Sequence, residues 1–129
     1  MTRFRRIAGE RGAVAVEFAL LLPVLVLLVF GIFEFGRVYN AQISITNAAR
    51  EGARYMAIHN NAPPAKTVAV NAAPSLSPAL VAANVTVSPL ECVAGSSVTV
   101  TVNYSFDFLT GYFGSTIPLT GKGVMQCGG

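Results

Sequence analysis

Residues 11–35, RGAVAVEFALLLPVLVLLVFGIFEF, decide how this chain is organised. Residues 18–33 carry no charge, and residues 13–33 form a 21-residue apolar stretch that only Glu17 interrupts. As an α-helix the longer stretch rises about 32 Å, which is enough to cross the hydrocarbon core of a bilayer. The stretch therefore predicts a transmembrane helix over residues 13–36, with an acidic side chain near its start.

The charges on either side of this stretch give it a direction. The formal net charge is +3, and residues 1–12 carry the whole excess, with four arginines against one glutamate. The other residues balance five basic against five acidic side chains. Because positive residues stay on the cytoplasmic side, we expect residues 1–12 to be a cytoplasmic basic leader and residues 35–129 to lie outside. No basic stripe remains to bind nucleic acid, so no nucleic-acid partner is expected.

Glu17 separates three interpretations of the apolar segment. A carboxylate at the centre of a membrane helix costs roughly 2.5–3.5 kcal/mol on insertion scales, so a segment that only anchors has no need of one. We expect trimming before Ala13, after which Glu17 finds a positive partner. A secretory signal peptide is the second interpretation, although the stretch is long for one and no small-x-small cleavage site follows it. An uncleaved signal anchor is the third, and it leaves the cost of Glu17 unexplained.

The helix is expected to continue beyond the membrane. Residues 37–58 place apolar or small side chains at one helical spacing and polar side chains on the opposite side. The apolar stripe is Val38, Ala41, Ile45, Ala48, Ala49, Ala53 and Met56. Residues 60–64, NNAPP, then end the helix. The prediction is one continuous helix over residues 14–58, with its extracytoplasmic part in residues 37–59.

Residues 60–129 are predicted to form a small exported α/β domain. A short helix is expected over residues 65–73, where Pro74 limits it. Three strand-like runs follow, at residues 85–87, 97–106 and 115–125. Pro118 lies within the last run and indicates that this strand is at the edge of the sheet.

The long central run indicates what the sheet packs against. Alternate residues of this run share one apolar face: Val98, Val100, Val102, Tyr104 and Phe106. A half-buried strand of this kind needs an apolar partner, and the outer part of the long helix provides one. The predicted fold class is therefore α+β, with a long N-terminal transmembrane helix and a small antiparallel β-sheet packed on its outer half.

Cys92 and Cys127 are the two cysteines of the chain. If residues 60–129 are exported, the oxidising compartment favours a disulfide between them. Closing a loop of this length stabilises a fold by about 4 kcal/mol in the chain-entropy model. Two buried, unpaired thiols are the alternative.

The sequence contains no recognisable catalytic or cofactor-binding motif. His59 is the only histidine, and no cysteine–histidine cluster exists to hold a metal, so no cofactor is expected and the chain is not expected to be an enzyme. The segment Gly121-Lys122-Gly123 lacks the spacing of a phosphate loop and is expected to turn a hairpin. A group of aromatic residues is expected in the core, with an exposed contact patch as the alternative: Tyr104, Phe106, Phe108, Tyr112 and Phe113.

Two blocks of this sequence resemble one protein family. The first is Arg11-Gly12 followed by AVAVEFAL at residues 13–20 and by Pro23, and the second is NAAREGARY at residues 47–55. Together they resemble the TadE/TadG-like pseudopilins, the TadE-like family of the tight-adherence Flp pilus system. The resemblance covers about residues 10–58 and implies a minor pilin-like subunit of a bacterial pilus.

The same resemblance implies a processing site. In that pilus system a membrane aspartic peptidase, the prepilin peptidase, cuts the leader on its cytoplasmic side after a glycine. On this chain the cut falls after Gly12, which makes Ala13 the N-terminus and Glu17 its fifth residue. Glycine suits such a site because its backbone readily adopts the extended form that enters a catalytic cleft. Pilins of the wider superfamily have Phe or Met after the cut, and Ala13 departs from that pattern.

Glu17, Phe18 and Pro23 are the residues expected to act in assembly. We expect the new α-amine of one processed subunit to pair with Glu17 of a neighbour as the helices bundle. Alternatively, Glu17 pairs within its own chain or lies at the cytoplasmic headgroups. Pro23 either kinks the helix for packing or is a tolerated membrane proline.

The expected function is that of a minor pilin-like (pseudopilin) subunit in the assembly or function of a tight-adherence pilus, serving surface adhesion and biofilm formation. The expected partners are the lipid bilayer, the prepilin peptidase, other pilin and pseudopilin subunits and the tight-adherence secretion machinery. The expected location is the bacterial inner membrane, with one pass, or the pilus and cell surface. The alternative function is an uncleaved, membrane-anchored extracytoplasmic binding module.

Overall fold

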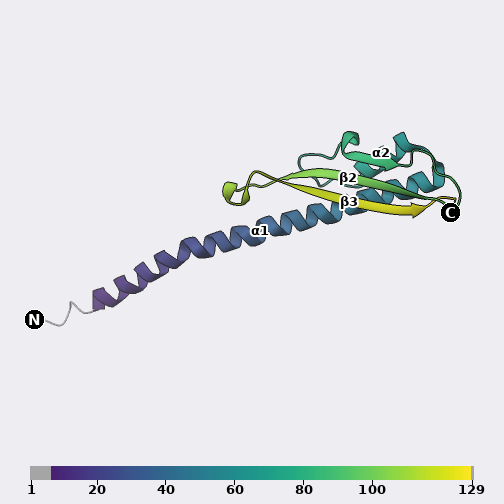
Figure 1. Ribbon diagram of the computed structural model, residues 1–129. Helices are drawn as coiled ribbons and strands as arrows, with labels where there is room; N and C mark the ends of the chain where they lie inside the picture. The colour runs from purple at the N-terminus through teal and green to yellow at the C-terminus, as the bar shows by residue number, and fades with distance from the viewer. Residues whose placement is uncertain (1–6, 129) are drawn as a thin grey trace, which may run out of the picture. The chain divides into compact units, whose positions relative to one another are not determined.

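The computed structural model describes residues 7–128 and contains a long helix, a short helix and a three-stranded antiparallel sheet (Figure 1). The chain forms two compact units, Met1–Phe35 and Gly36–Gly129. Half of the expected basic leader, residues 1–6, lies outside the described residues. A long apolar N-terminal helix with a small antiparallel sheet is the α+β architecture that the sequence predicts, so the predicted fold class is confirmed.

Helix α1 (Ile7–His59) starts earlier than the sequence predicts and ends where it predicts. The sequence predicts a start near residue 14, with Gly12 in an extended segment. In the structure Gly12 lies inside the helix, because α1 begins at Ile7. The end is set by Asn60, whose φ of 48° lies in the left-handed region that asparagine tolerates better than most residues. Its backbone N–H donates to the carbonyl oxygen of Met56 at 2.8 Å, which closes the last turn.

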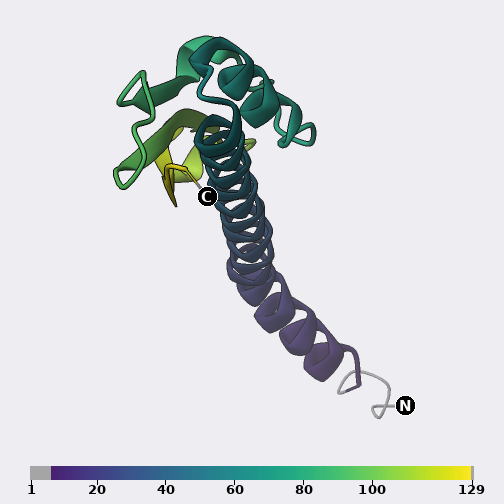
Figure 2. The same cartoon turned by 90° about the vertical axis from the view of Figure 1, so that its right-hand side faces the viewer.

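Helix α2 (Ala62–Asn71) begins three residues earlier than predicted. The two prolines at positions 63 and 64 lie in its first turn, so they start this helix as well as separating it from α1. Proline fits there because the first N–H groups of a helix have no intrahelical acceptor. Figure 2 shows α2 and the strands gathered around the last turns of α1.

The sheet is an antiparallel meander in the order β1-β2-β3. Strand β1 (Val85–Ser88) is short, while β2 (Ser97–Asp107) and β3 (Thr116–Gln126) pair along their whole length. All three predicted strands are therefore present. Pro118 lies in β3 opposite Ser105, and β3 is an edge strand, as the proline predicted.

The core of the second unit lies between one face of the sheet and one stripe of α1. On α1 the predicted stripe is buried from Ala41 to Met56, and Val38 packs against it half-buried. On β2 the predicted apolar face is buried: Val98, Val100, Val102, Tyr104 and Phe106. The alternate side chains of β2, mostly threonine, asparagine and serine, are exposed or half-buried on the other face. One apolar and one polar face is the pattern of a sheet covered on a single side.

Gly121 and Gly123 lie in the middle of β3, so the predicted hairpin turn at residues 121–123 is wrong. Both glycines face α1. A Cβ at Gly121 would lie 2.7 Å from the carbonyl carbon and oxygen of Ile45, and a Cβ at Gly123 would lie 2.5 Å from the carbonyl oxygen of Ala49. The strand therefore touches the helix backbone, and glycine is required because no side chain fits between them.

Cys92 and Cys127 are joined in a disulfide, with their Cα atoms 5.5 Å apart. Hydrogen bonds hold both ends of this bridge. The N–H of Cys127 donates to the carbonyl oxygen of Ser96 at 2.8 Å, and the N–H of Cys92 donates to the side-chain oxygen of Asn60 at 2.6 Å. The residue that ends α1 thus also fixes the loop that carries Cys92.

The aromatic group of β2 and the following loop divides between core and surface. Tyr104 and Phe106 are buried, Phe108 is half-buried, and Tyr112 and Phe113 are exposed. The prediction of core aromatics is correct for Tyr104 and Phe106, Phe108 packs against the core half-buried, and the prediction is wrong for Tyr112 and Phe113. The division falls where β2 ends at Asp107, because residues 108–115 lie beyond the paired strands.

Candidate processing and assembly segment

The first unit presents an apolar surface that nothing in it covers. The most apolar 18-residue window of α1 has a mean hydropathy of 2.8 and is 0% buried. Large side chains such as Phe18, Leu21 and Leu28 are each more than half exposed. In water such a surface would be strongly unfavourable, whereas hydrocarbon or neighbouring apolar helices cover it without cost. This part of α1 fits a single-pass membrane anchor.

Glu17 is the acidic interruption of this apolar surface. Its side chain is exposed, and no ion pair joins it to another of residues 7–128. Leu20, Leu21, Val24 and Leu28 follow Glu17 at helical spacing, so the carboxylate heads an otherwise apolar stripe. Within the described chain, then, the carboxylate has no cation to offset its transfer into hydrocarbon.

Gly12 and Ala13 lie in the helix five and four residues before Glu17. A Cβ at Gly12 would meet no atom within 4 Å, so packing does not require glycine there. Glycine destabilises a helix interior by about 1 kcal/mol relative to alanine. Gly12 therefore weakens the helix locally without a packing role that requires it.

Pro23 lies within α1, and the helix continues through it. Its nitrogen carries no hydrogen, so the carbonyl of Ala19 loses its usual donor one turn earlier. Pro23 is six residues beyond Glu17, which places it about 240° around the helix and off the Glu17 stripe. Phe18 is 59% exposed beside Glu17. The structure thus places the carboxylate and the proline on different faces of one uncovered segment.

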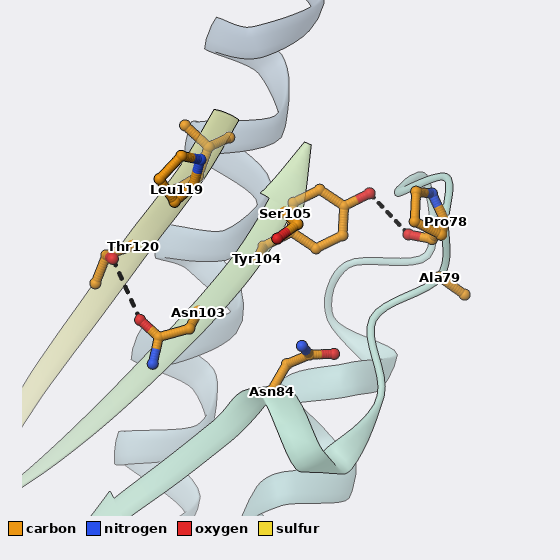
Figure 3. A pocket seen from close by; sticks show the side chains of 9 residues that line it. Pro78, Ala79, Asn84, Asn103, Tyr104, Ser105, Leu119 and Thr120 are labelled. Atoms are coloured by element: carbon orange, nitrogen blue, oxygen red, sulfur yellow. Dashed lines mark hydrogen bonds between the residues drawn. The ribbon is translucent and has the colours of Figure 1, made fainter. Parts of the chain in front are cut away.

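A cleft of about 320 Å³ lies where β2 extends beyond its pairing with β1, between β2, β3 and the loop that leads to β1 (Figure 3). The Tyr104 hydroxyl donates to the carbonyl oxygen of Pro78 at 2.7 Å, and the Thr120 hydroxyl donates to the side-chain oxygen of Asn103 at 3.2 Å. Burial raises the pKa of the Tyr104 phenol above its ordinary value of 10.0. The Asp107 carboxylate raises this pKa further, and the Arg37 guanidinium opposes the increase. Tyr104 is the one titratable side chain in the lining, and it holds the loop.

The other titratable groups are dispersed. His59 stacks on Tyr55 with ring centroids 4.1 Å apart, and its Nδ1 lies 3.2 Å from the Tyr55 carbonyl oxygen. Glu91 and Asp107 lie on different loops and strand ends of the second unit. Across residues 7–128 there is no group of three or more metal-binding side chains.

The comparisons with known proteins bear on the α1 segment. A family model described as "TadE-like protein" matches residues 12–54. No curated protein and no solved structure matches the chain. The matched segment is TadE-like. It begins at Gly12, includes Glu17 and Pro23, and ends before the sheet.

The match is a likeness of this segment to a family associated with the Tad pilus system. The family is not known as a family of enzymes. The match also runs past the apolar stretch into the stripe of α1 that the sheet covers, including Gly52. A Cβ at Gly52 would lie 3.1 Å from the Cβ of Ala69, so α2 crosses α1 closely at this point.

Glu34 is 1% exposed, although the sequence pattern around it indicates no role in the fold. This glutamate lies in the TadE-like segment, and its side chain or backbone takes part in an interaction with another residue. Its position directly after the apolar stretch made it resemble an ordinary polar flank. Only its burial distinguishes it from the exposed Glu17, and burial depends on the fold rather than on local sequence.

Proposed function

We propose that this chain is a minor pilin-like (pseudopilin) subunit of a tight-adherence, Flp-type pilus, acting in surface adhesion and biofilm formation. The observation that carries the proposal is Glu17, an exposed carboxylate in a membrane-length apolar helix that lies within the TadE-like match. A carboxylate in that place is unfavourable in a lone helix and favourable only beside a cation.

The first step of the proposed function is processing by a prepilin peptidase. Hydrolysis of the Gly12–Ala13 peptide bond leaves a carboxylate on Gly12 and a free α-amine on Ala13. The weak helix propensity at Gly12 supports a cut at this bond. Removal of residues 1–12 takes away four arginines and one glutamate. The new α-amine is positively charged at neutral pH.

The second step is assembly through that amine. The amine of Ala13 in one subunit pairs with Glu17 of a neighbour, while Phe18 packs beside the pair and Pro23 adapts the helix to its neighbours. The absence of an ion pair to Glu17 within residues 7–128 supports an intermolecular partner. The same carboxylate that disfavours the lone helix then favours the bundle.

The proposed location is the bacterial inner membrane, with residues 1–12 cytoplasmic, residues 13–36 spanning the bilayer, and both the helix of residues 37–59 and the domain of residues 60–129 outside. The arginines before the apolar stretch support this direction. The proposed partners are the bilayer, the prepilin peptidase, pilin and pseudopilin subunits and the tight-adherence secretion machinery.

Substitution of the carboxylate tests the assembly step. Glu17→Ala is expected to abolish fibres or co-purification with pilin subunits while the protein still fractionates with membranes. Glu17→Asp keeps the charge and is expected to restore part of the assembly. Glu51→Ala, which removes an exposed carboxylate of α1 outside the apolar stretch, is the matched control and is expected to assemble normally. Full assembly by Glu17→Ala would refute the role of Glu17.

The intact mass of the membrane-extracted protein tests the processing step. The expected mature form starts at Ala13, and a Gly12→Leu variant is expected to keep its full length. Gly9→Leu, at another uncrowded glycine of the same helix, is expected to be cut normally. A wild-type protein that keeps residues 1–12 and still builds fibres would contradict processing. If it keeps residues 1–12 and joins no fibre, the uncleaved anchored binding module becomes the better function.

A further inference from the structure

The closed end of the β2–β3 hairpin carries an uncharged apolar tip. Residues 108–115, FLTGYFGS, contain no charged side chain, and they include the short helical turn η2 (Gly111–Phe113). Leu109 is 69% exposed, Tyr112 is 76% exposed and Phe113 is 41% exposed. A hydrogen bond from the N–H of Phe108 to the carbonyl oxygen of Ser115, at 3.1 Å, closes the loop. The tip therefore presents apolar side chains from an ordered turn.

The contacts of β3 with α1 show which end of the second unit holds this tip. Gly123 lies on Ala49, Gly121 lies on Ile45, and Phe106, paired with Ile117 of β3, lies under Arg37. From Gly123 back to Ile117 the strand rises about 20 Å, and from Ala49 back to Arg37 the helix rises about 18 Å. Strand and helix thus run side by side, and the hairpin continues past Phe106 beyond the Arg37 end.

The Arg37 end of the second unit is also the end at which the apolar stretch enters it. Gly36 is the first residue of this unit, and Phe35 directly precedes it in the chain. If residues 13–36 cross a bilayer, the boundary of that bilayer lies next to Gly36. The guanidinium of Arg37 is 4.9 Å from the centre of the Phe106 ring. This contact between a cation and a buried aromatic ring therefore lies close to the point where β2 ends and the tip begins.

We propose that the tip of residues 108–115 inserts into the headgroup region of the outer leaflet and gives the exported unit a second contact with the bilayer. The inference rests on the membrane insertion that is part of the proposed function. Tyrosine suits this position because its ring is apolar and its hydroxyl is polar, and aromatic residues are enriched at this depth.

The opposite end of the second unit provides an internal comparison. Leu90 and Val93 are also exposed there, but Glu91 lies between them and is exposed as well. A carboxylate among the apolar residues disfavours entry into lipid. The tip lacks such a charge, so the two exposed apolar loops differ in the property that decides membrane contact.

The chain contains no tryptophan, so one introduced tryptophan reports on one site. The full-length protein is reconstituted into phosphatidylcholine–phosphatidylglycerol vesicles whose acyl chains carry bromine near the headgroup or near the bilayer centre. Tyr112→Trp probes the tip and Leu109→Trp repeats the measurement at a second tip position. Val93→Trp is the matched control at the far end, and Leu25→Trp reports whether the apolar stretch is inserted. Far-UV circular dichroism verifies that each variant is folded.

We expect the tryptophan of either tip variant to be quenched by the shallow bromine at least about twofold more than that of Val93→Trp, because interfacial aromatic rings lie at headgroup depth. The tryptophan of Leu25→Trp is expected to be quenched by the deep bromine.

Three outcomes would overturn the proposal, and they differ in what else they overturn. Suppose that brominated lipid quenches the tryptophan of Leu25→Trp but quenches those of both tip variants no more than that of Val93→Trp. The tip proposal is then overturned, while the proposed function is not. If the tip tryptophan is shielded from acrylamide but not quenched by brominated lipid, the tip lies against protein, which also overturns the proposal. If Leu25→Trp is not quenched, the proposed function fails together with the tip.

Discussion

The two parts of α1 are built from different side chains because they meet different surroundings. In residues 13–35 the helix carries large apolar side chains, and most are more than half exposed. In residues 36–59 the covered face is mainly alanine, with Ile45 and Met56, and it is fully buried. Large side chains suit a liquid surface that adapts to any shape, whereas small ones let a strand reach the helix backbone.

This contrast teaches that one helix can have two independent roles. The sheet-covered part owes its stability to the packing of β3, α2 and the disulfide within the second unit. The exposed part has no such cover within its own unit and fits a membrane anchor. Changes within the second unit should therefore alter its unfolding without altering membrane insertion, and the following predictions test that separation from the largest effect to the smallest.

The largest effect is expected from removal of the disulfide. The double variant Cys92→Ala/Cys127→Ala should lower the free energy of unfolding of the second unit by about 4 kcal/mol, because the unfolded chain regains the freedom of a 35-residue loop. Near-UV circular dichroism during urea unfolding of the detergent-solubilised chain measures the loss. Membrane fractionation should not change. Free thiols that react in wild-type protein from cells, without reductant, would contradict the disulfide.

The next effect is expected at the glycine contacts. Gly123→Ala should cost about 3 kcal/mol, since its Cβ would overlap the carbonyl of Ala49 and force β3 away from α1. Gly111→Ala is the matched control, because a Cβ there meets nothing within 4 Å. The same urea unfolding compares the two variants. Equal stabilities would show that the strand does not touch the helix backbone.

The smallest effect is expected at Tyr104. Tyr104→Phe removes its hydrogen bond to Pro78 and should cost about 1 kcal/mol. The folded-state pKa of this phenol is raised, so its stabilising contribution is complete below the unfolded pKa of about 10 and is lost as pH rises through the folded pKa. The free energy of unfolding of the wild type should thus fall above about pH 10 more than that of Tyr104→Phe. Tyr112→Phe, at an exposed ring, is the control and should follow wild type.

The elements of the second unit could be predicted because their apolar spacing is local. The stripe from Val38 to Met56 has the period of a helix, and the alternation from Val98 to Phe106 has the period of a strand. The role of Gly121 and Gly123 could not be predicted in the same way. A Gly-Lys-Gly segment suits a turn as well as a close approach, and the choice depends on a helix more than 70 residues earlier in the chain.

For Glu17 in the candidate site, the sequence is more informative than the fold. Glu17 is evident from sequence because it interrupts an apolar stretch, and the TadE-like match includes it. Its proposed partner belongs to another molecule, so the fold of a single chain adds little about its role. Glu34 is the reverse case, since its sequence context is ordinary and only the fold reveals that it is buried.

The contacts at the two glycines of β3 limit which second-site changes can rescue a substitution there. The atoms nearest to an added Cβ are backbone atoms of Ile45, Thr46, Ala49 and Arg50. Every amino acid carries these atoms, so no replacement on the helix can make room for a side chain at 121 or 123. Gly52 differs in degree, because a Cβ there would lie 3.1 Å from the Cβ of Ala69, 3.2 Å from the carbonyl oxygen of Ala65 and 3.3 Å from Cγ1 of Val100. A shift of a few tenths of an ångström relieves contacts of this length, and Ala69→Gly would remove the shortest of them. A suppressor screen should therefore recover compensating helix substitutions for Gly52→Ala and none for Gly123→Ala.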